Sequence, residues 1–170
     1  NGSSNISVRL GVGDGTFGTN ALYTVGNGPY FVALAYMNDD DTLDVLTANI
    51  GNDMITVSIG VGDGTFNPSM QFSGGGLAQD PYSLCVGDFN NDGNNDVAVA
   101  YYQSNDVVVF NGSISGNLIM SATYSVGSQP FGITCGHYDS DNKMDFAVAS
   151  YGSQNIQIYQ GDGLGAFTQY

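Results

Sequence analysis

The sequence predicts an all-β fold made of repeated units of short strands, on three observations. The 170 residues include 25 glycines and 16 acidic residues, all of them aspartate, which are turn residues rather than helix formers. No segment has the apolar spacing of an amphipathic helix. The third observation is a repeat, because the motif Gly-Val-Gly-Asp-Gly-Thr-Phe occurs at 11–17 and again, letter for letter, at 60–66.

The repeat has further landmarks. Weaker copies of the glycine-rich motif start at Asn111 and Gly161. A proline followed by an aromatic residue precedes three segments of similar pattern, at Pro29, Pro81 and Pro130. A period of about 50 residues, with several short strands in each unit, is typical of the blades of a β-propeller.

Each unit divides into the same elements. A first strand follows the proline, an aspartate-rich loop comes next, and a largely apolar second strand leads through a short turn to a third. The glycine-rich motif then leads to an outer fourth strand. Because the second strands are apolar, we expect both of their faces to be covered. The expected first strands are 31–36, 83–88 and 132–137, the second 44–48, 96–101 and 145–150, and the third 55–59, 107–110 and 156–159.

The number of units is too small for a closed ring. We expect a half blade at 1–26, full blades at 27–78 and 79–127, and a partial blade at 128–170. Four blades of this period would need about 200 residues. The sequence therefore predicts about three and a half four-stranded blades in one domain, forming an open arc.

The loop at 88–96 has the spacing of a cation site. Oxygen-bearing side chains occupy its first, third, fifth and ninth positions, and Gly93 suits the sharp turn at the sixth. Calcium accepts six to eight oxygen ligands in a flexible geometry. The predicted Ca²⁺ ligands are Asp88, Asn90, Asp92, the carbonyl of Asn94, and Asp96.

The other two loops depart from this pattern. The loop at 36–44 begins with tyrosine in place of the first carboxylate, and the loop at 137–145 begins with histidine, a poor calcium ligand. We expect calcium affinity to fall from 88–96 to 36–44 to 137–145, where a lysine can neutralise the carboxylates in place of an ion. The candidate metal positions are Asn38, Asp40, Thr42 and Asp44 in one loop, and Asp139, Asp141, Lys143 and Asp145 in the other.

These features resemble the FG-GAP/VCBS repeats that build integrin-α-type β-propellers. The resemblance rests on the Asp-x-Asn-x-Asp-Gly-x-x-Asp pattern at 88–96, the Gly-Asp-Gly-Thr-Phe turns and the repeated prolines. It implies four-stranded blades with calcium between their first two strands, held by the five ligands named above. It also implies a role in adhesion or recognition outside the cell.

Charge excludes several classes of partner. The net charge is −14, and Arg9 and Lys143 are the only basic side chains. Nucleic acids require a basic surface, an anionic membrane would repel the chain, and no apolar run is long enough to insert into a bilayer. The single histidine, His137, has no recognisable nucleophile partner. We therefore expect a protein that is not an enzyme.

Cysteines and sequons suggest a secreted protein. Cys85 and Cys135 lie on neighbouring first strands, where they form either a disulfide between blades or two buried free thiols. Glycosylation sequons begin at Asn1, Asn5 and Asn111, and we expect Asn111, in an exposed hairpin, to be the best acceptor.

The open ends of the arc direct the functional hypothesis. Unpaired strand edges are templates for pairing with another chain, and a head-to-tail contact gives a ring or a filament. We expect a secreted, calcium-stabilised homo-oligomer with a structural role. The alternative is an extracellular adhesion or glycan-binding module that interacts with sugars or proteins, or a fragment of a longer propeller.

Overall fold

The computed structural model describes residues 3–170 and confirms the all-β prediction. It contains fourteen β-strands joined by turns and loops. Within these residues there is no helix, and so none that could cross a membrane.

The strands form three four-stranded antiparallel sheets and one two-stranded sheet. Each four-stranded sheet is a meander in which the strands follow chain order, as expected for a propeller blade. Blade one contains β3 (Pro29–Ala35), β4 (Asp44–Asn49), β5 (Met54–Ser58) and β6 (Met70–Ser73). Blade two contains β7 (Pro81–Gly87), β8 (Asp96–Tyr101), β9 (Asp106–Asn111) and β10 (Ile119–Ser125). Blade three contains β11 (Pro130–Gly136), β12 (Asp145–Ser150), β13 (Asn155–Gly161) and β14 (Phe167–Gln169).

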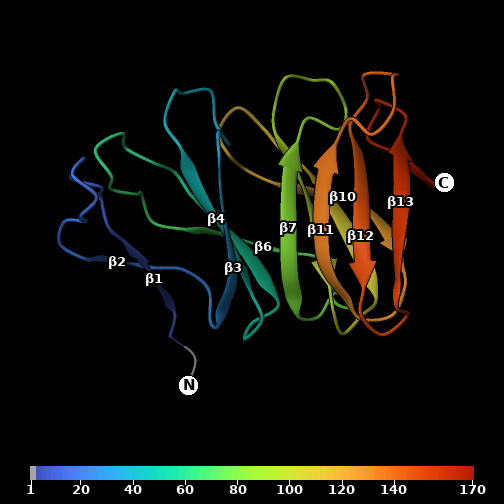
Figure 1. Ribbon diagram of the computed structural model, residues 1–170, viewed down its shortest axis with the longest axis horizontal. Coiled ribbons are helices and arrows are strands. Elements are labelled where there is room, and N and C mark those ends of the chain that lie inside the picture. Colours follow the sequence, from blue (N-terminus) through green and yellow to red (C-terminus); the bar gives the residue numbers. More distant parts are fainter. Residues whose placement is uncertain (1–2) are drawn as a thin grey trace.

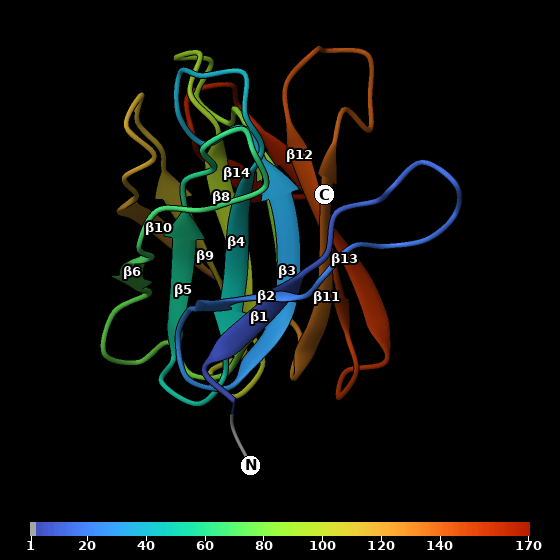
Figure 2. The same ribbon diagram turned by 90° about the vertical axis from the view of Figure 1, so that its left-hand side faces the viewer.

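The N-terminal half blade is the two-stranded sheet of β1 (Asn5–Val8) and β2 (Ala21–Thr24). It supplies the third and fourth strands of a blade, and it lies across one side of blade one (Figure 2). The blades follow one another along the longest axis of the molecule (Figure 1). The innermost strand of blade two, β7, contacts both β3 and β11. The predicted open arc of propeller-type blades is thus confirmed.

The first strands differ from the prediction at both ends. They begin at the proline instead of after it and end one residue earlier than expected. Proline is tolerated as the first residue of a strand because no ladder hydrogen bond requires its missing N–H. The strand register then shifts by one residue across Tyr30, Tyr82 and Phe131, which indicates a β-bulge after each proline.

The hydrophobic cores lie between blades. Alternate residues of β8 point to opposite sides of its sheet, as in any strand. Val97 and Val99 join Leu46 of blade one in one buried cluster, whereas Ala98 joins Phe146 of blade three in another. The strands β4 and β8 are therefore buried along their whole length, as their apolar composition predicts.

Blade three ends in a short fourth strand and is more exposed than its neighbours. This strand, β14, is only three residues long and pairs with β13, at the place where the sequence predicts the start of a fourth strand. The side of blade three that faces away from blade two is uncovered within the described residues. Exposed positions consequently appear in β12 and β13, whereas β8 is fully buried.

Candidate functional site

The loop at 88–96, called loop two, connects β7 to β8 and is held together by its own polar groups. The Asp88 carboxylate accepts hydrogen bonds from the N–H groups of Asp92 (3.1 Å) and Gly93 (2.9 Å). The Asn90 side-chain oxygen also accepts from Asp92 N–H, at 2.9 Å. Gly93 has a φ of 88°, as its position in the turn predicts.

Asp92 is the centre of the second half of loop two. Its Oδ1 accepts from the backbone N–H of Asn94 at 2.8 Å and from the Asn94 side-chain amide at the same distance. The backbone bond is the main reason why the pKa of the Asp92 carboxyl lies below its ordinary value, because it favours the ionised form. Asn90 donates to its other oxygen at 3.1 Å.

Asp96 has a role that spacing alone does not reveal. Its carboxylate is fully buried, with Oδ2 accepting from Phe89 N–H at 2.9 Å and Oδ1 accepting from Gly112 N–H at 2.8 Å. Burial raises the pKa of this carboxyl, while the two N–H donors oppose the rise. The side chain predicted to close a calcium shell thus fastens the start of loop two to the end of β9.

The same arrangement recurs in the other blades. Asp44 Oδ2 accepts from Met37 N–H at 2.7 Å, and its Oδ1 accepts from Gly60 N–H at 2.8 Å. Asp145 bonds to Tyr138 N–H at 2.9 Å and to Gly161 N–H at 3.0 Å. We call Asp44, Asp96 and Asp145 the latch aspartates. A backbone function explains why the ninth loop position is aspartate even where the first is tyrosine or histidine.

Loop one, at 36–44, keeps an oxygen-rich interior. Asp40 Oδ1 accepts from Thr42 N–H at 2.8 Å and also from the Thr42 hydroxyl, and the Asn38 amide donates to Asp40 Oδ2 at 2.6 Å. The Asn38 side-chain oxygen is buried and has no hydrogen-bond donor within the described residues. A buried acceptor without a donor is costly, and a cation would satisfy it.

Loop three, at 137–145, carries a cation of its own. The Lys143 ammonium lies 3.1 Å from Asp141 Oδ2, and the Lys143 N–H donates to Asp141 Oδ1 at 3.0 Å. The backbone bond is the largest contribution to the lowered pKa of the Asp141 carboxyl. Asp139 Oδ2 accepts a hydrogen bond from the Gln160 side-chain amide, at 2.8 Å.

The donor set of loops one and two suits a hard cation. Within residues 3–170, no three His, Cys, Asp or Glu side chains converge closely enough to form a metal site by themselves. Amide, hydroxyl and carbonyl oxygens would have to complete any coordination shell, and calcium accepts all of these. Apart from the latch aspartates, loop two has two carboxylates at its predicted ligand positions, Asp88 and Asp92, whereas loop one has one, Asp40, together with the unpartnered Asn38 oxygen.

The loops also connect successive blades. Asp39 N–H of loop one donates to Ile114 O of blade two at 3.2 Å. In loop two, Phe89 O accepts from Gly165 N–H of blade three at 3.1 Å, and the Asn91 amide donates to Gly163 O at 3.0 Å. Sequence spacing placed these loops between strands of one blade. The structure adds that they lie at the seams between blades.

A disulfide ties one of these seams. Cys85 of β7 and Cys135 of β11 are bonded, with their Cα atoms 5.8 Å apart. The bond joins the innermost strands of blades two and three. The sequence left open a disulfide or two free thiols, and the structure contains the disulfide.

The sequon at Asn111 is less accessible than expected. Asn111 is the last residue of β9, half-buried, and its side-chain oxygen is buried without a donor among the described residues. The exposed part of the hairpin begins at Ile114, so Asn111 does not lie in an exposed segment as the sequence analysis expected. Asn5 is exposed and its side-chain oxygen accepts from the Thr24 hydroxyl at 3.0 Å, while Asn1 lies outside the described residues.

Sequence analysis missed a group of aromatic side chains, which we call the aromatic stack. The bulged residues Tyr30, Tyr82 and Phe131 meet near the inner strands. The ring centroid of Tyr82 lies 4.4 Å from that of Tyr30 and 5.3 Å from that of Phe131. Tyr102 stacks on Tyr82 at 4.5 Å. The repeated proline-aromatic pairs were the available signal. Tyr30 and Phe131 are about half exposed.

The sheets and the loops at their seams define a segment of a β-propeller made of repeat blades. Two stretches of the chain, 37–99 and 88–148, match the family of FG-GAP-like repeats. Together they span well over half of the sequence, and the chain therefore belongs to this family. None of the curated proteins compared with the chain matches it.

Proposed function

We propose that this chain is a secreted, calcium-stabilised propeller module with a structural, non-enzymatic role, which it performs by associating with further copies of itself. The observation that carries the proposal is the uncovered face of blade three. Ile156 of β13 is 72% exposed, whereas Val107, at the same position of β9, is 0% exposed.

The packing between the blades supports this choice of partner. In blades one and two, the side that contains Ile55 or Val107 packs against the next blade. The hollow on the uncovered side of blade three has a volume of about 690 Å³ and is bordered by seven residues, Phe131, Ala149, Ser150, Tyr151, Gln154, Asn155 and Ile156. The chemistry that fits it is the apolar face of another blade.

Charge favours a second copy as that partner. The net charge of −14 makes most close contacts between copies repulsive. None of the residues that border the hollow is charged. Two copies that meet on this face bury apolar surface without bringing aspartates into direct opposition, and a self-complementary contact of this kind closes as a two-fold dimer. A filament or ring would need a second contact elsewhere on the chain.

The test is sedimentation velocity over a range of concentrations. We expect wild type to associate and Ile156→Asp to remain monomeric. Leu77→Asp is the matched control, because Leu77 is almost fully exposed but lies in the loop between blades one and two. A wild-type monomer at all concentrations, or equal association of Ile156→Asp, would contradict self-assembly.

Calcium would bind mainly in loop two, with Asp88, Asn90, Asp92 and the carbonyl of Asn94 as ligands and Asp96 adding an oxygen while it keeps its backbone bonds. Asn38 and Asp40 are the corresponding ligands of loop one. The bound ion would supply positive charge to a cluster of negative oxygens, and it would stiffen loops that span the seams.

The disulfide supports a location outside the cell, because such bonds persist in oxidising compartments. Extracellular location also agrees with the glycosylation sequons.

A second candidate function, glycan binding, is favoured by the aromatic stack. Half-exposed rings such as Tyr30 and Phe131 can pack against the apolar face of a sugar. A glycan array probed with wild type and Tyr30→Ala tests this function. Binding that survives the substitution, or no binding by wild type, would count against the aromatic stack as a sugar site.

A further inference from the structure

The aromatic stack borders a pair of carboxylates at the seam between blades one and two. Asp53 lies in the turn between β4 and β5 of blade one, and Asp80 directly precedes β7 of blade two. The Asp53 Oδ1 atom accepts a hydrogen bond from the Asp80 N–H at 2.8 Å. The Asp80 carbonyl in turn accepts from the N–H of Tyr102, a member of the stack, at 2.8 Å. Backbone bonds thus fasten both acidic residues to the blade-two part of the stack.

The two carboxylates lie near each other and near the tyrosine hydroxyls. Burial is the main cause of the raised pKa of the Asp80 carboxyl, and the negative charge of Asp53 adds to it. The pKa of the Tyr82 hydroxyl is also raised, by burial first and then by two neighbouring tyrosines and Asp80. The Tyr101 side chain is fully buried, its hydroxyl has no hydrogen-bond partner within residues 3–170, and its pKa is raised by burial and then by Asp53.

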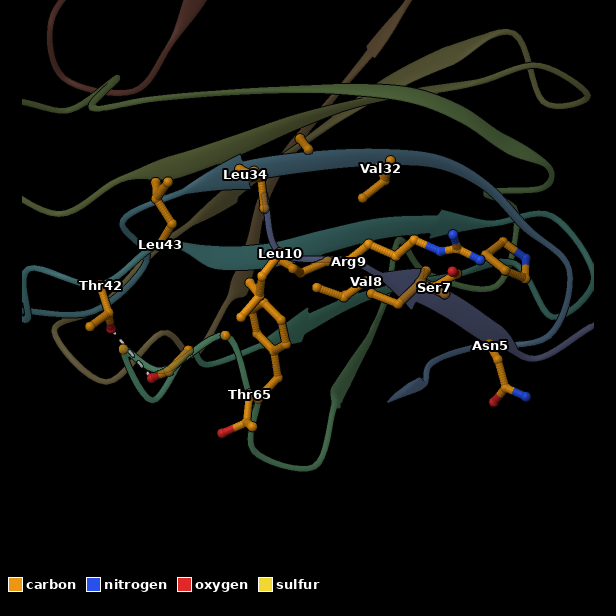
Figure 3. Close-up of a pocket in the computed structure, with 18 of the residues that line it drawn as sticks. Asn5, Ser7, Val8, Arg9, Leu10, Val32, Leu34, Thr42, Leu43 and Thr65 are labelled. Atoms are coloured by element: carbon orange, nitrogen blue, oxygen red, sulfur yellow. Dashed lines mark hydrogen bonds between the residues drawn. The ribbon is translucent and has the colours of Figure 1, made fainter. Parts of the chain in front are cut away.

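Neither basic side chain of the protein neutralises this pair of carboxylates. Lys143 is paired with Asp141 in loop three. Arg9 lines the groove between β1 and β3, which one ring of the stack also borders, and Figure 3 shows it in that groove. The charge that acts on the Asp80 carboxyl is that of Asp53, and it is negative. Carboxylates without a counter-charge beside aromatic rings attract an ammonium group.

The tyrosine hydroxyls of the stack are available to a polar ligand. Four other tyrosine hydroxyls form hydrogen bonds to protein groups, whereas those of Tyr30, Tyr82 and Tyr102 form none within residues 3–170. A phenol hydroxyl both donates and accepts a hydrogen bond. A sugar hydroxyl does the same, whereas an arginine or lysine side chain can only donate. The hydroxyls therefore favour a sugar over a basic peptide.

The exposure of this site is independent of the ends of the chain. Its residues lie in blade two and in the adjoining turn of blade one, and blade two has a blade on each side, because β7 contacts both β3 and β11. Tyr82 and Tyr102 are nevertheless partly exposed. Their ring planes are 21° apart, and stacked rings offer a flat apolar surface against which a sugar ring can pack.

We propose that the aromatic stack, together with Asp53 and Asp80, binds a cationic amino sugar. The apolar face of the sugar packs on the stacked rings, and its hydroxyls pair with the tyrosine hydroxyls. Its ammonium group is held by the carboxylates and by the ring faces. The net charge of −14 also favours a cationic ligand over an anionic one. The inference rests on the glycan-binding function proposed above and names the class of sugar.

The probes are two β-1,4-linked hexamers, one of glucosamine and one of glucose. They differ only in whether each unit carries an ammonium or a hydroxyl group. Each is titrated into the full chain in a calorimeter at about pH 6, where the carboxylates are ionised. We expect the glucosamine hexamer to bind about tenfold more tightly than the glucose hexamer, because only the former gives charge-assisted hydrogen bonds.

Three variants locate the binding. Asp80→Asn should weaken binding of the glucosamine hexamer about tenfold and leave the glucose hexamer unchanged. The variant should remain folded, since the Asp80 side chain accepts no hydrogen bond within residues 3–170. Tyr82→Leu should weaken both hexamers about fivefold, and circular dichroism checks that it is folded. Asp41→Asn is the matched control, because Asp41 is exposed in loop one, at the opposite end of β3 from the stack, and it should bind as wild type.

The outcomes separate this inference from the glycan function on which it rests. Equal binding of the two hexamers, or equal weakening by Asp80→Asn and Asp41→Asn, would overturn the preference for a cationic sugar and leave glycan binding by the stack intact. Absence of binding by both hexamers would overturn the inference, and absence of binding by every sugar on the glycan array would remove the glycan function with it. Binding of an arginine hexapeptide that depends on Asp80, without binding of the glucosamine hexamer, would overturn the choice of a sugar.

Discussion

Replacing Asp96 with alanine should destabilise the protein with or without calcium. The substitution leaves the buried N–H groups of Phe89 and Gly112 without acceptors. Each such loss costs about 1–3 kcal/mol. Removing the carboxylate also removes the cost of its burial, which raises its pKa in the native protein, so we expect a net loss of about 2–4 kcal/mol. A domain of this size has about 5–15 kcal/mol in total.

The assay is urea unfolding followed by circular dichroism, because the chain has no tryptophan. It is run once with excess calcium and once with a chelator. Asp96→Asn should fall between wild type and Asp96→Ala, since it keeps one acceptor oxygen but turns an amide donor toward the other N–H. Asp106→Ala is the control, because within residues 3–170 the Asp106 carboxylate accepts only from the exposed Ser125 hydroxyl, and the substitution should change stability by less than about 0.5 kcal/mol.

Two results would refute the role of Asp96 as an acceptor for the buried N–H groups of Phe89 and Gly112. One is a loss below about 1 kcal/mol for Asp96→Ala in chelator. The other is a loss of stability in Asp96→Ala that appears only when calcium is present, since the Asp96 side chain would then act as a metal ligand and not as a backbone acceptor.

Three further predictions concern the metal, the disulfide and a turn. Asp92→Ala should lower the melting temperature in calcium more than Asp40→Ala, and calorimetry in chelator should abolish the difference; equal effects under both conditions would contradict calcium binding in loop two. Cys135→Ser should lower the free energy of unfolding by about 4 kcal/mol, given the 50-residue separation of the bonded cysteines; a urea midpoint unchanged from wild type would argue against this bond. Thr65→Val should raise the pKa of Asp63, measured by NMR, back toward its ordinary 3.8, because the Thr65 hydroxyl is the main cause of its lowering. The turn's contribution to stability is therefore present above pH 3.8 and lost as pH falls through the lowered folded value, and an unmoved Asp63 titration would reject this assignment.

Much of the fold was predictable because the turn motifs, the prolines and the apolar segments of the sequence all indicate the same repeat. The duplicated glycine-rich motif locates the turns, the prolines locate the inner strands, and the apolar second strands locate the cores. Their agreement fixes the blade architecture without knowledge of any single contact.

The candidate site was less predictable, for physical reasons. An aspartate at the ninth loop position suits a calcium ligand and a backbone acceptor equally, and only the buried N–H groups around Asp96 distinguish the two. The aromatic stack depends on bulges, and a bulge changes which side of the sheet a residue faces. Asn111 was misplaced because strand ends are fixed by pairing with the neighbouring strand, which spacing alone does not specify.

The disulfide makes the two seams between the three complete blades unequal. Blades two and three are joined covalently through Cys85 and Cys135, whereas blade one is joined to blade two by non-covalent contacts and by the chain itself. Chain segments open in cooperative units that follow such boundaries. The arc should therefore come apart in order, with blade one separating as a unit while the cross-linked pair persists as a folded remnant. The glycine-rich connection at 74–76 is then the natural point of cleavage, and the persistent piece begins near Pro81.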